Sequence, residues 1–121
     1  MFDHVVLNVS DAEASKRFYA AALEPLGISI LGEHGNLVGI GKDRDAFFWI
    51  AEREPVSTGA HVAFPCDDRA TVAAFHAAAV EAGGVDNGSP GLRDVYSPTY
   101  YGAYVLDPDG NNIEAVTHSL E

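Results

Sequence analysis

The stretch His4-Val5-Val6-Leu7-Asn8-Val9 decides the fold, because the chain contains it in two related copies. When the sequence is shifted by 57 positions, residues 2–28 align with residues 59–85 without a gap, and His4 falls on His61. An internal repeat has to be interpreted before any single element is assigned. Two copies of this length are too few for a solenoid, so the repeat predicts a duplicated half-domain.

Composition limits the classes of protein to consider. A chain of 121 residues with 47% hydrophobic residues can build one domain with its own core. The net charge of −11 argues against nucleic acid and anionic membranes as partners. No apolar run is long enough to span a membrane, and the N-terminus lacks a signal-peptide pattern. The single cysteine, Cys66, fits a reducing compartment, so we expect a cytoplasmic protein.

Hydrophobic periodicity predicts the same order of elements in both halves. In the first half we expect a helix that starts with a capping box at Ser10 and ends near Leu23. Strands are expected over residues 3–9, 28–31, 37–40 and 46–51. In the second half we expect a helix over residues 69–82, capped by Asp67, a loop at residues 88–91, and strands over residues 60–64, 100–106 and 112–117.

This order predicts an α+β fold of two tandem βαβββ modules, about residues 1–55 and 59–121, within a single domain (1–121). Each helix has to bury its apolar side on one face of its sheet, which leaves the other face uncovered. If the halves pair with approximate two-fold symmetry, the mixed sheets curl around a central trough with the helices outside. The repeated histidines lie on the strand faces that line this trough.

His4, His61 and Glu114 form the candidate metal site. Glu114 is the lone acidic residue within its strand, and a buried glutamate is costly without a partner. Two neutral imidazoles and one carboxylate bind a divalent ion and leave positions open for water and substrate. The alternative is that the histidines are core or rim residues that the duplication copied.

The pattern resembles the vicinal oxygen chelate superfamily, which includes glyoxalase I, extradiol dioxygenases, and fosfomycin- and bleomycin-resistance proteins. The resemblance rests on the paired modules, the histidine in the first strand of each, and the closing segment Asp107-Pro108-Asp109-Gly110-Asn111-Asn112-Ile113-Glu114. It implies a glyoxalase-like fold with metal ligands His4, His61 and Glu114. Trp49 stands where glyoxalase I has a further ligand, so the three remaining ligands are similar to the dioxygenase and fosfomycin-enzyme arrangement.

The resemblance implies a divalent-metal-dependent enzyme that acts on a small substrate with vicinal oxygens. The ion, which could be Zn, Fe, Mn or Ni, would act as a Lewis acid, with Glu114 as the possible base. An aromatic wall would contact the substrate, with contributions from Phe47, Trp49, Tyr96, Tyr100 and Tyr101.

The alternative function is binding of a small molecule without catalysis, as in bleomycin-resistance proteins. Trp49 and the net charge of −11 favour it, whereas the three ligand residues count against it. The large open sheet faces predict a homodimer, because exposed apolar surface of this size is normally covered. The modules that share a trough can then belong to one chain or to two.

Overall fold

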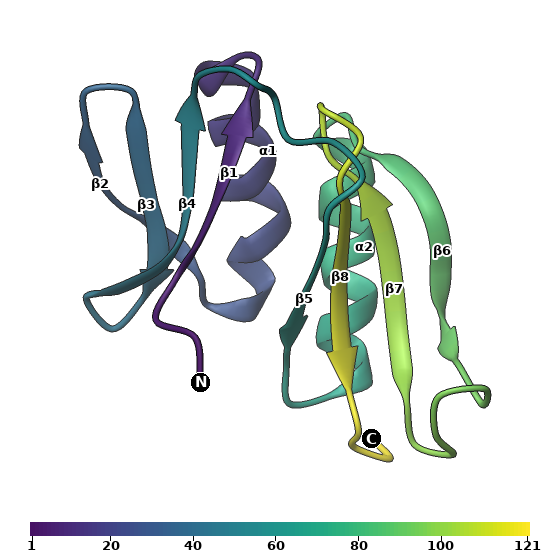
Figure 1. The fold of residues 1–121 in the computed structure, drawn as a ribbon. Helices are drawn as coiled ribbons and strands as arrows, with labels where there is room; N and C mark the ends of the chain where they lie inside the picture. Colours follow the sequence, from purple (N-terminus) through teal and green to yellow (C-terminus); the bar gives the residue numbers. More distant parts are fainter.

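A computed structural model describes all 121 residues as two βαβββ modules (Figure 1). The first module contains β1 (Val5–Val9), α1 (Ala12–Leu23), the short 3₁₀ helix η1 (Glu24–Leu26), β2 (Ser29–His34), β3 (Leu37–Lys42) and β4 (Asp45–Glu52). The second contains β5 (His61–Pro65), α2 (Arg69–Glu81), β6 (Val85–Leu92), β7 (Tyr101–Leu106) and β8 (Asn112–Thr117).

The two sheets have the same strand order, which confirms the predicted α+β fold of two repeated modules. The first sheet has the order β1-β4-β3-β2 and the second the order β5-β8-β7-β6. In each sheet the first strand pairs in parallel with the last, and the other pairs are antiparallel. The parallel pairing follows from the helix that connects the first strand of each module to the rest of its sheet.

Both helices lie on the same side of the two sheets, as Figure 1 shows, and they close one continuous core. Twenty buried residues form this core, drawn from both helices and both sheets. Phe48 and Phe64 meet edge to face across the modules, with their ring centroids 5.5 Å apart. The opposite sheet faces carry no helix, so the residues that alternate with the core residues are available for a site.

The helix caps lie one residue later than predicted. Asp11, rather than Ser10, caps α1, and Asp68, rather than Asp67, caps α2. Both aspartates have an extended backbone, with φ of −147° and −151°, and each accepts from a backbone N–H three residues on. Ser10 instead donates to Asp109 at 2.6 Å, which connects the end of β1 to the second module.

Residues 88–91 form part of β6, so the predicted loop is wrong. The glycines and Pro90 that indicated a loop are tolerated because β6 is an edge strand that pairs only with β7. The pairing shifts register near Gly88 and again before Gly91, as expected for an irregular edge. No helix is both long and apolar enough to cross a membrane.

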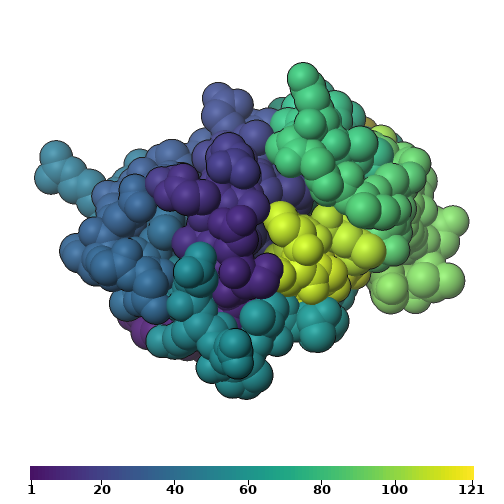
Figure 2. Space-filling view, turned by 90° about the horizontal axis from the view of Figure 1, so that it is seen from above, coloured from purple at the N-terminus to yellow at the C-terminus, as the bar shows by residue number.

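A buried carboxylate connects the turn between β7 and β8 to the rest of the fold. Asp107 is 4% exposed and accepts hydrogen bonds from the Tyr19 hydroxyl and from the backbone N–H groups of Asp109 and Asn111. The Asn111 side chain donates both to Asp107 and, at 2.9 Å, to the carbonyl of Ser57 in the linker. Figure 2 shows the yellow atoms of the second module against the teal linker and the purple N-terminal segment.

Candidate functional site

The uncovered face of the second sheet carries a row of residues centred on Glu114. Ala63 of β5 pairs with Glu114 of β8, which in turn pairs with Tyr104 of β7. His61 lies two residues before Ala63 and therefore projects from the same face. The alternation along β5 and β8 thus brings the predicted His61 and Glu114 to one site.

His61 and Glu114 form a direct pair, with 2.7 Å between Nε2 of the imidazole and Oε1 of the carboxylate. The His61 side chain is 52% exposed, whereas that of Glu114 is 1% exposed. A carboxylate buried this deeply is stable only when its oxygens are paired. The pair therefore joins a half-exposed imidazole to a buried carboxylate.

The second oxygen of Glu114 accepts a hydrogen bond from the hydroxyl of Tyr100. Burial, and then this hydrogen bond, raise the pKa of Tyr100, so the phenol remains a donor. Gly102, on the neighbouring strand, leaves the space for the carboxylate, since a Cβ there would lie 3.1 Å from Oε2. Glu114 is therefore fixed from both oxygens.

Trp49 occupies in the first module the position that Glu114 occupies in the second. Val6 of β1 pairs with Trp49, and Ala63, the repeat equivalent of Val6, pairs with Glu114. The indole lies against Gly39, where a Cβ would be only 2.8 Å from the ring. A cavity of about 490 Å³ on this face is lined by Trp49, His4 and Arg53, among others. The first module thus offers an aromatic surface where the second offers a carboxylate.

His4 lies on the uncovered face of the first module, away from the other two predicted ligands. Its Nδ1 is 2.6 Å from Oδ1 of Asp3, which leaves Nε2 as the nitrogen available for another partner. The side chain is 51% exposed. Within one chain no group of three or more His, Cys, Asp or Glu side chains is arranged to hold a metal ion. The structure brings His61 and Glu114 together, but not His4.

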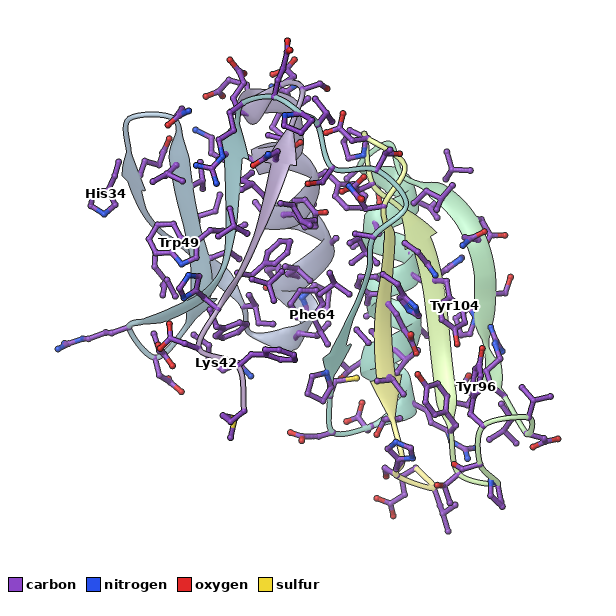
Figure 3. All side chains as sticks on the ribbon, viewed as in Figure 1. His34, Lys42, Trp49, Phe64, Tyr96 and Tyr104 are labelled. Atoms are coloured by element: carbon purple, nitrogen blue, oxygen red, sulfur yellow. The ribbon has the colours of Figure 1, made fainter.

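The predicted aromatic residues separate into four places, and Figure 3 labels two of them, Tyr96 and Trp49. Tyr96 stacks on Tyr100 with ring centroids 5.0 Å apart, and both lie near Glu114. Tyr101 points to the helix face, where the guanidinium of Arg69 lies 4.7 Å from its ring. Phe47 lines a cavity between the modules, and Trp49 lies on the first sheet. Only Tyr96 and Tyr100 lie at the His61–Glu114 pair.

Two residues at this site were not among those predicted from the sequence. The ring of Tyr104 lies 6.0 Å from that of His61, and the guanidinium of Arg93 lies 5.1 Å from the ring of Tyr104. Tyr104 shares strand parity with Tyr100, so alternation along residues 100–106 was a signal that could have identified it. Arg93 lies in an irregular segment, where no periodicity indicates the direction of a side chain.

His61 and Glu114 have the chemistry of divalent-metal ligands, although one chain brings only these two together. An imidazole nitrogen and a carboxylate oxygen suit zinc, iron, manganese or nickel. The phenol of Tyr100 is the kind of outer-shell partner that orients a ligating carboxylate. His61 and Glu114 supply two protein donors in each chain, and an accessible imidazole such as His4 would complete a three-residue set.

Two helix-backed βαβββ modules, with a histidine–carboxylate pair on the uncovered face of the second, define the class of protein. Residues 1–115 match the model of the Glyoxalase/Bleomycin resistance protein/Dioxygenase superfamily. The chain belongs to this superfamily, which agrees with the resemblance found in the sequence.

Solved structures include similar chains. A glyoxalase/bleomycin resistance protein from Albidiferax ferrireducens is 34% identical, with a TM-score of 0.85, over 97% of this chain and 98% of that one. A glyoxalase I variant from Zea mays is 25% identical, with a TM-score of 0.70, over 95% of this chain and 45% of that one. The oxidase ChaP-H2 shares the fold at 21% identity and a TM-score of 0.68, over 97% and 92% of the two chains. A comparison with curated proteins finds no match.

Proposed function

We propose that the protein is a divalent-metal-dependent enzyme of the glyoxalase/dioxygenase type that acts on a small substrate with two adjacent oxygens. The observation that carries the proposal is the contact between the half-exposed imidazole of His61 and the buried carboxylate of Glu114. A buried carboxylate that is held by a phenol and lies next to a half-exposed imidazole is better explained by metal binding than by a contribution to stability.

His61 and Glu114 would hold the ion, and the ion would supply Lewis-acid stabilisation of negative charge on the substrate oxygens. Tyr100 keeps the carboxylate of Glu114 in one orientation. Tyr96 and Tyr104 give the substrate an apolar boundary on the same face. Glu114 is also the carboxylate best placed to act as a base, because it lies beside the proposed ion.

The third ligand would come from a homodimer, in which His4 of the partner subunit faces the His61–Glu114 pair. His4 supports this role because Asp3 binds its Nδ1 and thereby directs Nε2 outward. The uncovered sheet faces supply the surface for such a pairing. The proposed site is then built from the first module of one protomer and the second module of the other.

Metal content tests the proposal directly. Protein purified without a histidine tag is expected to carry about one divalent ion per protomer, measured by plasma mass spectrometry. His61→Ala should lose this ion, because a ligand is removed from a site with few ligands. His76→Ala is the matched control, since His76 lies on α2 and pairs with Asp86. Equal metal content in His61→Ala and the native protein would contradict the metal site.

The dimer is tested by light scattering and subunit mixing. The measured mass should be about twice the 12.8 kDa of one chain. His4→Ala and Glu114→Ala homodimers should each lose the metal, whereas mixed dimers, isolated with two different tags, should regain one of their two sites. The reason is that each mixed dimer pairs an intact His4 with an intact Glu114 once. A monomeric protein, or mixed dimers without metal, would refute the shared site.

The second candidate function is binding of a small molecule without catalysis. The observation that favours it is the cavity of about 490 Å³ that Trp49 lines, because tryptophan cannot bind an ion. In that case Trp49→Ala would abolish ligand binding while His61→Ala would leave it unchanged. Loss of binding in His61→Ala would favour the enzyme.

A further inference from the structure

A cavity of about 310 Å³ beside His61 has an unusual balance of charge. The chain contains 18 acidic and 7 basic residues, yet no acidic side chain lines this cavity. Its polar and aromatic lining consists of His61, Asn87, Arg93, Tyr96, Tyr104 and Asn112. Arg93 therefore supplies a positive charge that no lining carboxylate neutralises, next to the proposed metal site.

The guanidinium of Arg93 is held in place before any ligand arrives. One of its nitrogens donates to the carbonyl of Ser89 at 2.6 Å, and its plane lies over the ring of Tyr104. Two glycines make room for it, because a Cβ at Gly91 or Gly88 would lie 3.0 or 3.2 Å from a guanidinium nitrogen. A fixed guanidinium loses little conformational entropy when a ligand binds.

The hydrogen-bonding capacity of Arg93 is not exhausted by these contacts. A guanidinium has five N–H donors, and the side-chain contacts of Arg93 within the chain go to the carbonyls of Ser89 and Leu92. The remaining donors suit the planar, bidentate geometry of a carboxylate. The Arg93 guanidinium lies next to Gly88, which pairs with Tyr104, and Tyr104 pairs with Glu114. Two strand spacings, about 10 Å, therefore separate Gly88 from Glu114 across the sheet.

We propose that Arg93 selects substrates that carry a carboxylate, binding this group while the adjacent oxygens of the substrate reach His61 and Glu114. This inference rests on the proposed function, because it places the metal-binding oxygens at that pair. The substrate class is a small acid whose carboxylate and vicinal oxygens stand at opposite ends of a short rigid body. Arg93 is thus a specificity-determining residue rather than a catalytic one.

Three probes test the inference by calorimetry under nitrogen, with one equivalent of zinc and again with a chelator. Protocatechuate has vicinal oxygens and a carboxylate, catechol lacks the carboxylate, and benzoate lacks the vicinal oxygens. The native protein should bind protocatechuate at least about tenfold more tightly than catechol, as a charge-assisted bidentate contact predicts. Arg93→Gln should abolish this preference, and Arg93→Lys should retain part of it.

Arg17→Gln is the matched control, because Arg17 is exposed on α1 and should keep the full preference. The ratio between the two probes does not respond to a merely structural role of Arg93, since both probes meet the same folded protein. Equal affinities in the native protein, an unchanged ratio in Arg93→Gln, or no binding of either acid would overturn the inference. If Arg93 determines the binding of both acids and the chelator has no effect, the carboxylate site stands and the metal function fails.

Discussion

Replacement of Asp107 by alanine is expected to lower the free energy of unfolding by about 3–5 kcal/mol, among the largest effects of any single substitution in this chain. The carboxylate is 4% exposed and accepts from the hydroxyl of Tyr19, the side chain of Asn111 and two backbone N–H groups. Alanine would leave these buried donors without an acceptor, and each unsatisfied donor costs about 1–3 kcal/mol. Urea unfolding followed by circular dichroism measures the loss.

Two variants separate the buried network from a general effect of charge. Tyr19→Phe removes one hydrogen bond to the carboxylate, so we expect a loss of about 1.5–3 kcal/mol. Burial, and then the neighbouring Asp107, raise the pKa of Tyr19, which keeps the phenol protonated as a donor. Asp67→Ala removes an exposed carboxylate outside any helix cap and should change stability by less than about 0.5 kcal/mol. Similar losses in Asp67→Ala and Asp107→Ala would show that the network is not responsible.

The same network explains why the two modules form one core. Asp107 and Asn111 come from the second module, Tyr19 comes from the first, and Ser57 belongs to the linker. The proline and glycine of residues 107–110 are typical of a turn, and the turn is present, with the N–H of Gly110 bonded to the carbonyl of Asp107. The role of Asp107 between modules was not predictable, because a local turn pattern contains no information about a partner 88 residues away in the chain.

Repeats and alternation carried most of the information about the fold. The coincidence of His4 with His61 identified two modules, and the registers now place Val6 and Ala63 in equivalent positions. The errors at the helix caps lie where either of two neighbouring residues can cap. Ser10 and Asp11 can both cap a helix, and only the backbone conformation selects between them.

The candidate site was predictable in part, for a physical reason. Alternation along a strand specifies a face, which is why His61 and Glu114 lie together on the second sheet. It does not specify how two sheets are arranged, so the position of His4 relative to this pair was open. Arg93 and its carbonyl contacts depend on the irregular edge of β6, where side-chain direction is set by register shifts rather than by period.

The first and second modules have therefore diverged in chemistry while keeping one fold. Trp49 against Gly39 gives an aromatic surface, and Glu114 beside Gly102 gives a fixed carboxylate, although both occupy the same register position. In each case a glycine on the neighbouring strand makes room for the larger side chain. A change in this pair of positions alters the chemistry of the open face without disturbing the core on the other side of the sheet.

Replacement of Glu114 by glutamine is expected to weaken zinc binding by about a hundredfold or more, because it removes the one anionic donor of the proposed site. Glutamine has nearly the same size and can still accept from Tyr100, so the fold should persist. Competition with a zinc-sensitive dye gives the dissociation constant. Tyr100→Phe should weaken binding by about tenfold to a hundredfold, as loss of an outer-shell partner does. Glu81→Gln, at the exposed end of α2, should have no effect.

The stability of the metal-free Glu114→Gln variant distinguishes a functional carboxylate from a structural one. Glu114 is 1% exposed, and its one potentially cationic partner, His61, is half-exposed. The net contribution of such a buried charge to folding is small even when it is hydrogen-bonded, so the free energy of unfolding of the glutamine variant should fall by no more than about 1 kcal/mol. Loss of zinc with stability retained would assign Glu114 to binding. A large loss of stability with zinc affinity unchanged would make the His61–Glu114 pair structural and remove the basis for the proposed enzyme.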